Sequence, residues 1–317
     1  MCRLPLCDAF SVRLACLRIA CRLVRFFPVG PTIAAAILIA VSADCSADAR
    51  EHKVLDRFSF KAESVTQWRL PNRLGEISGL AMTPGGRLLA VDDEVAVVYE
   101  LDYVAGGVIK SFAFGTPVVK GDFEGIAVAG DLVYLTTSEG RVYVAAEGAD
   151  GQTVTFEQYD TKLGENCEIE GLVQSSDNSR LYFLCKAVRK KSIQHKLMLF
   201  AWDIKNRELR PHESVRLPVK KIRKQLRVDQ INPSAVTIDR HTGNWIVIAA
   251  RQRVLVEINK QGQLLSATNT LRKSRHRQPE GIELTADGRL LIADEGGRHK
   301  ARLAVYRQQA GNSEQQK

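Results

Sequence analysis

The sequence contains none of the short motifs that mark the common hydrolase and nucleotide-binding sites. It has no G-x-S-x-G turn, no H-E-x-x-H helix, no G-x-x-x-x-G-K-[ST] loop and no C-x-x-C pair. These absences exclude the serine-hydrolase, zinc-peptidase, P-loop and dithiol classes that depend on those motifs. Aromatic residues make up only 7% of the chain and do not cluster with basic ones. We therefore expect no nucleic-acid partner.

Cysteine is scarce outside the first 50 residues. Five of the seven cysteines lie before residue 46, and only Cys167 and Cys185 follow. Two cysteines in an oxidising compartment can form a disulfide, and two buried free thiols are equally compatible with the sequence. The pairing of these two residues is left open at this point.

Long apolar runs are absent except for one, at residues 26–43. Five arginines precede or border this run, and the pattern Ala47-Asp48-Ala49 follows it. A basic region, an apolar stretch and small residues at a cleavage point predict a secretory signal. Because the run is barely long enough to cross a bilayer, an inner-membrane tether through residues 26–43 is the alternative. We expect residues 1–49 to be a signal peptide or membrane anchor, and residues 50–317 to be exported.

The exported part contains five copies of one motif. Each copy has two polar positions flanking an apolar one, followed by a small residue and a further apolar residue. The copies are Glu76–Ala81, Asp122–Ala127, Glu168–Val173, Asn232–Thr237 and Gln278–Glu283. Their small residues are separated by 46, 46, 64 and 46 positions. Equal steps of this kind indicate an internal structural repeat.

Each motif precedes a turn and two further apolar, β-rich runs. A period near ~45 residues with about four strands per unit is typical of β-propellers. The sequence thus predicts an all-β fold with five four-stranded blades, most simply a monomer. A six-bladed propeller of the TolB or NHL type is the alternative, but its extra blade would have to fit the insertion around residues 203–231.

An N-terminal strand is expected to close the propeller. Residues 54–60 resemble residues 108–114, the expected outer strand of the first repeat, and the last repeat ends after its third strand. An N-terminal strand would complete the last blade and leave no open sheet edge. Within the insertion, the basic run at residues 220–227 is expected to be a loop.

The polar positions of the motif form two sets that alternation places on the same side of each strand. The first ring consists of Glu76, Asp122, Glu168, Asn232 and Gln278. The second ring consists of Ser78, Glu124, Glu170, Ser234 and Glu280. Six of these residues are carboxylates, and like charges crowded in a channel raise pKa values or require a cation. All-oxygen ligands suit Ca²⁺, so we expect calcium at Glu124, Glu170 and Glu280, assisted by Glu76, Asp122 and Glu168. Carboxylates that cap backbone amides and bind water are the alternative.

Other polar groups give weaker signals. Acidic residues end the second strand of two repeats, at Asp92 to Glu94 and at Asp294 and Glu295, where we expect solvated turns rather than the channel mouth. None of the six histidines falls in either ring. His276 and His299 are expected at the surface.

The motifs resemble a known family. Residues 70–81 and the segment Asp122-Phe123-Glu124-Gly125-Ile126-Ala127 are similar to those of the SdiA-regulated (YjiK-like) family, and the resemblance covers about residues 54–307. It implies an exported or inner-membrane-tethered β-propeller with a calcium site made by the repeat glutamates, and it implies no reaction. At the fourth repeat, Ser234 and Ala235 replace the Glu-Gly pair, which puts a fully acidic ring in doubt.

Two classes of function fit these observations. One is a calcium-containing binding module for an unknown small molecule or protein, in the periplasm or on the periplasmic face of the inner membrane. The other is a calcium-dependent hydrolase of esters, lactones or phosphate esters, in which the metal would activate water. Fold alone does not separate these, and whether the chain is an enzyme is left open.

Overall fold

The structure is a computed structural model that describes residues 53–189 and 197–309. The predicted leader at residues 1–49, with its possible tether at 26–43, lies outside these residues. In the part of the chain that the structure describes, no helix has the length and apolar character needed to cross a membrane.

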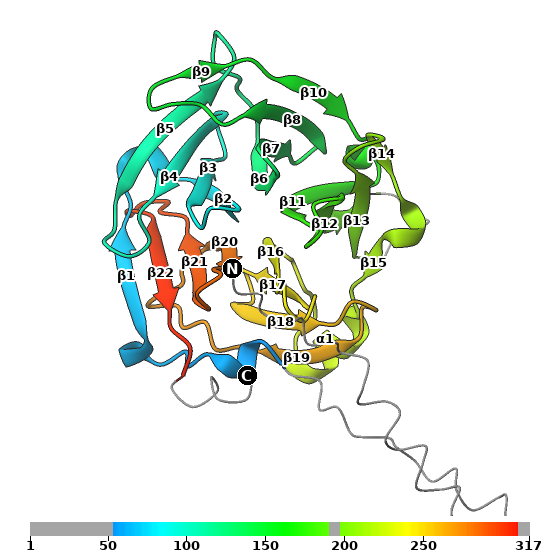
Figure 1. Ribbon diagram of the computed structural model, residues 1–317. Helices are drawn as coiled ribbons and strands as arrows, with labels where there is room; N and C mark the ends of the chain where they lie inside the picture. The colour runs from blue at the N-terminus through cyan, green and yellow to red at the C-terminus, as the bar shows by residue number, and fades with distance from the viewer. Residues whose placement is uncertain (1–52, 190–196, 310–317) are drawn as a thin grey trace, which may run out of the picture. The chain divides into compact units, whose positions relative to one another are not determined.

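Five β-sheets surround a central axis, with one strand of each sheet nearest that axis (Figure 1). Blade 1 contains β2 (Ile77–Met82), β3 (Leu88–Asp92), β4 (Val97–Leu101) and β5 (Val108–Phe114), with β9 (Thr153–Val154) added in parallel to β5. Blade 2 contains β6 (Phe123–Ala129), β7 (Leu132–Thr137), β8 (Arg141–Ala146) and β10 (Glu157–Asp160). The predicted five-bladed propeller is confirmed.

The remaining blades follow the same meander. Blade 3 contains β11 (Cys167–Gln174), β12 (Arg180–Val188), β13 (Met198–Asp203), β14 (Glu208–Leu209) and β15 (Val215–Arg216). Blade 4 contains β16 (Ala235–Ile238), β17 (Trp245–Ala249), β18 (Val254–Ile258) and β19 (Leu264–Thr268). Blade 5 contains β20 (Pro279–Leu284), β21 (Leu290–Asp294), β22 (Arg302–Tyr306) and β1 (Val65–Arg69). Short 3-10 helices in the described segments are Leu55–Arg57, Ala62–Ser64, Asn72–Leu74, Leu163–Glu165 and Pro211–Glu213.

The propeller is closed by an N-terminal strand, as expected, but not by the expected residues. The closing strand is β1, which pairs antiparallel with β22 from Val65 opposite Tyr306 to Arg69 opposite Arg302. The predicted segment 54–60 instead contains a 3-10 helix and a single bridge between Phe58 and Gln308. The reason lies in blade 4, where the buried Glu257 carboxylate accepts the backbone N–H groups of residues 54 and 55, at 2.7 and 3.0 Å, and so bends this segment away from a ladder.

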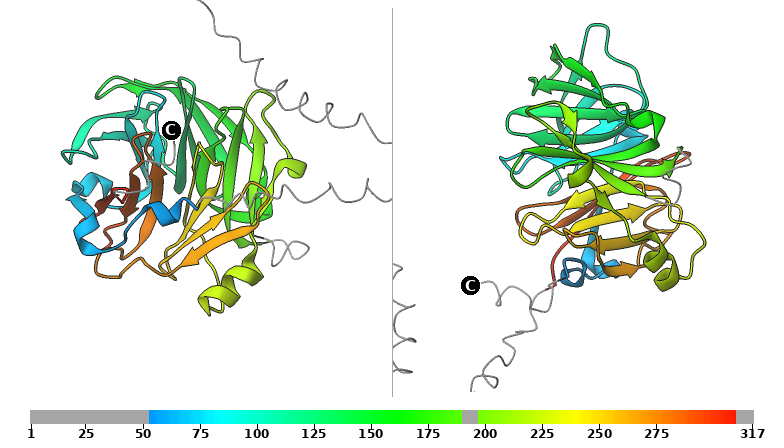
Figure 2. Two further views of the ribbon diagram at one scale, coloured as in Figure 1. Left: turned by 60° about the horizontal axis from the view of Figure 1, so that its bottom comes forward. Right: turned by 90° about the vertical axis from the view of Figure 1, so that its right-hand side faces the viewer.

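The insertion after blade 3 contains a helix rather than the loop that was predicted. Helix α1 (Val219–Leu226) turns Val219, Ile222 and Leu226 toward the hydrophobic core, and Ile222 is fully buried. Residues spaced by three and four positions share one helix face, so the basic residues between them remain exposed. Gln225 ties the helix to β19 through a 3.0 Å bond from its amide to the carbonyl of residue 267, at the outer rim seen in Figure 2.

The hydrophobic core lies in layers between neighbouring blades. Both faces of the inner strands are covered, so every residue of β2 and β3 is buried, whereas the outer strand β5 buries only Phe112 and Phe114 and exposes Ile109. Aromatic pairs cross the layers, as where the rings of Tyr182 in blade 3 and Trp245 in blade 4 meet edge to face at 4.6 Å. This packing fixes the angle between blades, and it therefore sets how closely the inner strands approach the axis.

Candidate functional site

The channel-facing positions of the repeat coincide with β-bulges in the inner strands. In β2, Ile77 pairs with Asp92 and Gly79 with Val91, so Ser78 is the extra residue. The same register shift leaves Glu124 unpaired in β6 and Glu280 unpaired in β20, and a shift in β11 spans Glu170. A bulge bends the strand and re-aims the side chain of the extra residue. The second ring is thus displayed by four repeated backbone irregularities.

The glycines after two of the second-ring positions, Gly79 and Gly125, are required by the neighbouring blade. A Cβ atom on Gly125 would lie 2.6 Å from the backbone nitrogen of Leu172, and one on Gly79 would lie 3.1 Å from that of Ile126. Because backbone atoms approach this closely, the inner strands leave a cavity of only about 10 Å³ on the axis, lined by Ser78, Glu124 and Glu280 among others. That space is enough for about one water molecule.

The structure brings the three predicted second-ring carboxylates together. Burial raises the pKa of Glu124 to about 10 and that of Glu280 to about 8, and in both cases the negative charge of Glu170 adds to the rise. Burial also raises the pKa of Glu170, to about 7. In the absence of a ligand, this ring therefore keeps protons at neutral pH, because the charged forms are desolvated and repel one another.

A lysine at the ring was missed by the sequence interpretation. The Lys186 ammonium donates to the carboxylate of Glu170 and lies 3.5 Å from that of Glu168. This contact counteracts the effect of burial on Glu170, whose pKa rises least among the three. The sequence contained a signal for this lysine. Lys186 occupies the same position in its repeat as Asp93 and Glu295 do in theirs, directly after the buried residues of the second strand.

One buried hydroxyl at the ring has no partner. Ser78 is 7% exposed, and its Oγ makes no hydrogen bond with any residue in the described part of the chain. The corresponding Ser234 of blade 4 differs, since its Oγ donates to the carbonyl of Pro279 at 2.9 Å. An unpaired buried polar atom is costly, so the Ser78 hydroxyl is a natural contact for a small ligand or a water molecule.

The first ring does not act as one group. Asp122 accepts a hydrogen bond from Ser138 beside the second ring, and Glu168 lies near Lys186. Glu76 lies with a different acidic group, in which burial and then the charge of Glu76 raise the pKa of Asp93 to about 7. Of the six predicted ligands, Glu124, Glu170, Glu280, Asp122 and Glu168 lie near enough for their charges to influence one another, whereas the charge of Glu76 acts on Asp93 and on Glu295 of blade 5.

Of the acidic residues that end the second strands, Asp92 and Asp294 are buried, contrary to the prediction of solvated turns, whereas Glu94 is exposed as expected. Asp92 is 8% exposed and Asp294 is 2% exposed. Each carboxylate accepts the backbone N–H of a first-ring residue, Glu76 at 3.4 Å and Gln278 at 3.3 Å. Asp92 and Asp294 therefore fix the backbone where the inner strand begins, at equivalent positions in blades 1 and 5. This role is structural.

His276 is likewise buried rather than at the surface. Its ring lies between Asp294, at 2.7 Å from Nδ1, and the hydroxyl of Tyr306, at 2.5 Å from Nε2, and no part of it is exposed. The three side chains fasten the loop before β20 to blade 5. His299 is exposed, as expected.

The geometry does not fit the predicted calcium site. Across residues 53–189 and 197–309, no three or more His, Cys, Asp or Glu side chains form a group that could hold a metal ion. Lys186 places its ammonium where a divalent ion would need the carboxylates of Glu170 and Glu168, and like charges repel. Calcium stays a prediction, and no hydrolytic step is derived from it.

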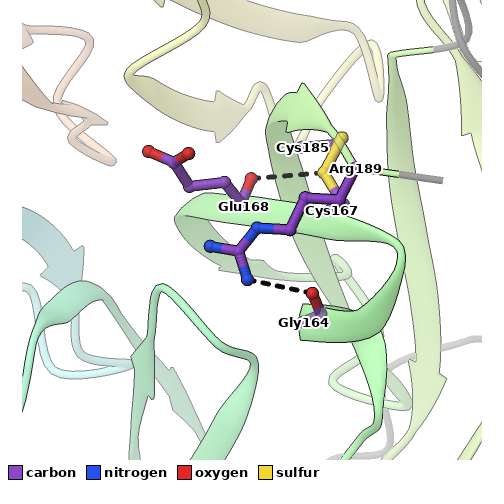
Figure 3. The surroundings of a disulfide bond; sticks show 5 residues. All are labelled: Gly164, Cys167, Glu168, Cys185 and Arg189. Atoms are coloured by element: carbon purple, nitrogen blue, oxygen red, sulfur yellow. Dashed lines mark hydrogen bonds between the residues drawn. A yellow bond between two sulfur atoms is a disulfide. The ribbon is translucent and has the colours of Figure 1, made fainter.

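Cys167 and Cys185 form a disulfide, with their Cα atoms 5.8 Å apart. The bond joins β11 to β12, and Figure 3 shows the Glu168 side chain extending away from it. Nearby, Arg189 donates to the carbonyl of Gly164 at 3.0 Å. The disulfide therefore braces the two strands that carry Glu170 and Lys186.

Comparison with known proteins supports the fold and identifies the family. Glutaminyl cyclase from Myxococcus xanthus has a similar structure, with a TM-score of 0.50 and 14% identity over 76% of this chain and 93% of that one. A luciferin-regenerating enzyme also gives a TM-score of 0.50, with 10% identity over 78% of this chain and 96% of that one. At such identities the likeness shows the propeller fold alone. No curated protein matches this sequence. The SdiA-regulated family model matches residues 58–299, so the chain belongs to the SdiA-regulated family.

Proposed function

We propose that this chain is a binding propeller that takes the ammonium group of a small molecule at the second ring. The observation that carries the proposal is the ring itself, where burial raises the pKa of Glu124, Glu170 and Glu280, and where the Lys186 ammonium contacts only Glu170 among these three. Lys186 contacts Glu170, so Glu124 and Glu280 are left without a cation within ion-pair distance in the described residues.

The size of the site favours a single ammonium head. The axial cavity accommodates about one water molecule, and an ammonium group is of similar size. Such a group donates three hydrogen bonds, for which Glu124, Glu280 and the unpartnered Ser78 hydroxyl supply acceptors. Binding would displace protons from the ring, since the ligand favours the charged carboxylates.

Calorimetric titration of the purified chain with propylammonium chloride tests this proposal. Tetramethylammonium chloride is the matched probe, because it carries the same charge without an N–H donor and is larger than the cavity. We expect binding of propylammonium only, tighter near pH 8 than near pH 6, and weakened at least about tenfold in Glu280→Gln, the loss of one charged hydrogen bond. Equal heats from both probes, or no loss in the variant, would contradict the proposal.

Calcium provides the competing outcome. Metal analysis and melting curves with EDTA and with added calcium would show whether the ring holds this ion instead. If calcium copurifies at one ion per chain and EDTA lowers the melting temperature, the calcium site predicted from the sequence is correct. A search for ester, lactone or phosphate-ester hydrolysis would then follow.

We also propose export. The basic region, apolar run and A-x-A pattern of the first 49 residues support it, and so does the disulfide, because such bonds persist in oxidising compartments. Fractionation of cells with thiol labelling tests this directly. Export predicts unlabelled Cys167 and Cys185 in the periplasmic or membrane fraction, whereas labelled cysteines in the cytosolic fraction would refute it.

A further inference from the structure

A second, basic groove lies at the outer edge of blade 5, away from the channel. It is formed by the segment from Lys61 to Gln67 and the loop that precedes β20, and it has a volume of about 620 Å³. In Figure 1 this first segment leads into β1 at the lower left of the ring, and β19 lies along the lower edge. Volumes of this order are typical of sites for small molecules.

The groove carries unbalanced positive charge. Lys61, Arg272 and Arg275 line it, and none of them has a carboxylate within ion-pair distance in the part of the chain that the structure describes. Glu63 is the one acidic residue among the lining side chains, so the groove has two excess positive charges. Ser274 adds a hydroxyl at the same place.

Arg275 is held in place by the fold rather than by an anion. One of its Nη atoms donates to the carbonyl of Phe60 at 2.7 Å, and its own carbonyl accepts from the Gln67 amide at 3.4 Å. Its Nε is buried without a partner among the described residues. The next residue, His276, is fixed by its buried contacts. The guanidinium is thus anchored by its inner edge, and little side-chain freedom remains to be lost on binding.

From these contacts we infer that the groove is an anion-binding site for a phosphate group. An anchored guanidinium offers paired donors to oxyanions, and Arg272 and Lys61 add charge from both sides of the groove. Two excess positive charges match a phosphate dianion better than a single carboxylate. Val65 and Ala62 give the groove an apolar wall for an organic part of the ligand. This site is separate from the second ring and does not depend on the ammonium proposal.

Titration of the full chain with inorganic phosphate at constant ionic strength tests this inference. The informative variant is Arg272→Gln, because Arg272 is exposed and its loss should not disturb folding. Lys221→Gln, which removes an equally exposed charge on α1, is the matched control. We expect phosphate to bind the wild-type chain and the control alike, and to bind Arg272→Gln about tenfold more weakly, as the loss of one charged contact implies. Equal weakening in both variants, or no binding up to about 10 mM phosphate in any arm, would overturn the proposal.

A second arm distinguishes the source of the phosphate. Cosedimentation with phosphatidylglycerol vesicles is compared with binding of soluble glycerol phosphate, using the same two variants. Vesicle binding that Arg272→Gln reduces and Lys221→Gln does not, without binding of the soluble compound, assigns the phosphate to a lipid headgroup. Binding of the soluble compound with the same dependence on Arg272 assigns it to a free metabolite. Vesicle binding that falls equally in both variants reflects the overall positive charge and counts against the site.

Discussion

Replacing Glu280 by Gln is expected to stabilise the propeller against unfolding, and to do so more strongly as the pH rises. Glu280 lines the channel, and burial is the main cause that raises its pKa to about 8 from an ordinary value of 4.5. Below about pH 4.5 the carboxyl is protonated in the folded and the unfolded chain, so wild type and variant should differ little. As the pH increases, the unfolded chain ionises first, and the wild type loses folding free energy until the pH passes about 8.

The magnitude follows from the displacement of this pKa. Each tenfold change in an ionisation constant corresponds to about 1.4 kcal/mol, which sets an upper limit of about 4 kcal/mol near pH 8. Glu280 is half-buried, and water reaching its carboxylate reduces the penalty. We therefore expect the difference in unfolding free energy between Glu280→Gln and the wild type to be about 2–4 kcal/mol larger near pH 8 than near pH 4.5.

Urea unfolding of both proteins at these two pH values, with EDTA present, measures this difference. Glu165→Gln is the control, because it makes the same chemical change at an exposed carboxylate that has no hydrogen bond or ion pair within the described residues. If the advantage of Glu280→Gln is the same at both pH values, or is reversed near pH 8, the account of a desolvated carboxylate ring is wrong. The same variant should bind propylammonium poorly, so stability and binding would change in opposite directions.

Three further changes test the packing around the ring. Gly125→Ala should cost about 1–3 kcal/mol or more by thermal unfolding, because its Cβ would lie 2.6 Å from a backbone nitrogen, whereas Gly85→Ala, 3.8 Å from its nearest neighbour, should be close to neutral. Removing the disulfide by replacing both cysteines with Ala should lower the unfolding free energy by about 3 kcal/mol. An unchanged urea midpoint would show that the two cysteines do not form a disulfide in the protein. His276→Ala should lose about 2–4 kcal/mol, more than Tyr306→Phe, because it leaves two buried polar groups unpaired and not one.

Repetition made much of the fold predictable from the sequence. The equal spacing of Gly79, Gly125 and Gly171 records the distance along the chain from one inner strand to the next, and this distance is a local property. Ser78 and Glu124, which precede the first two of these glycines, line the axial cavity, and a β-bulge rather than simple alternation presents them there. Helix α1 was not predicted, although Val219, Ile222 and Leu226 have the spacing of one helix face, because the basic residues between them are equally typical of a solvated loop.

Contacts between distant segments were decided by the tertiary structure alone. Which N-terminal residues close the last blade depends on Glu257, some 200 positions away, which holds the segment before β1 in a bent form. The second strands of three blades supply Lys186 at the ring and the buried Asp92 and Asp294. The ends of these strands meet the inner strands only in the assembled blade. The sequence by itself determined how many strands repeat and which small and polar residues recur, because these follow from spacing along one chain. The charge balance of the channel was decided only when separate blades brought their side chains together, because electrostatic energy depends on distance in space and on burial.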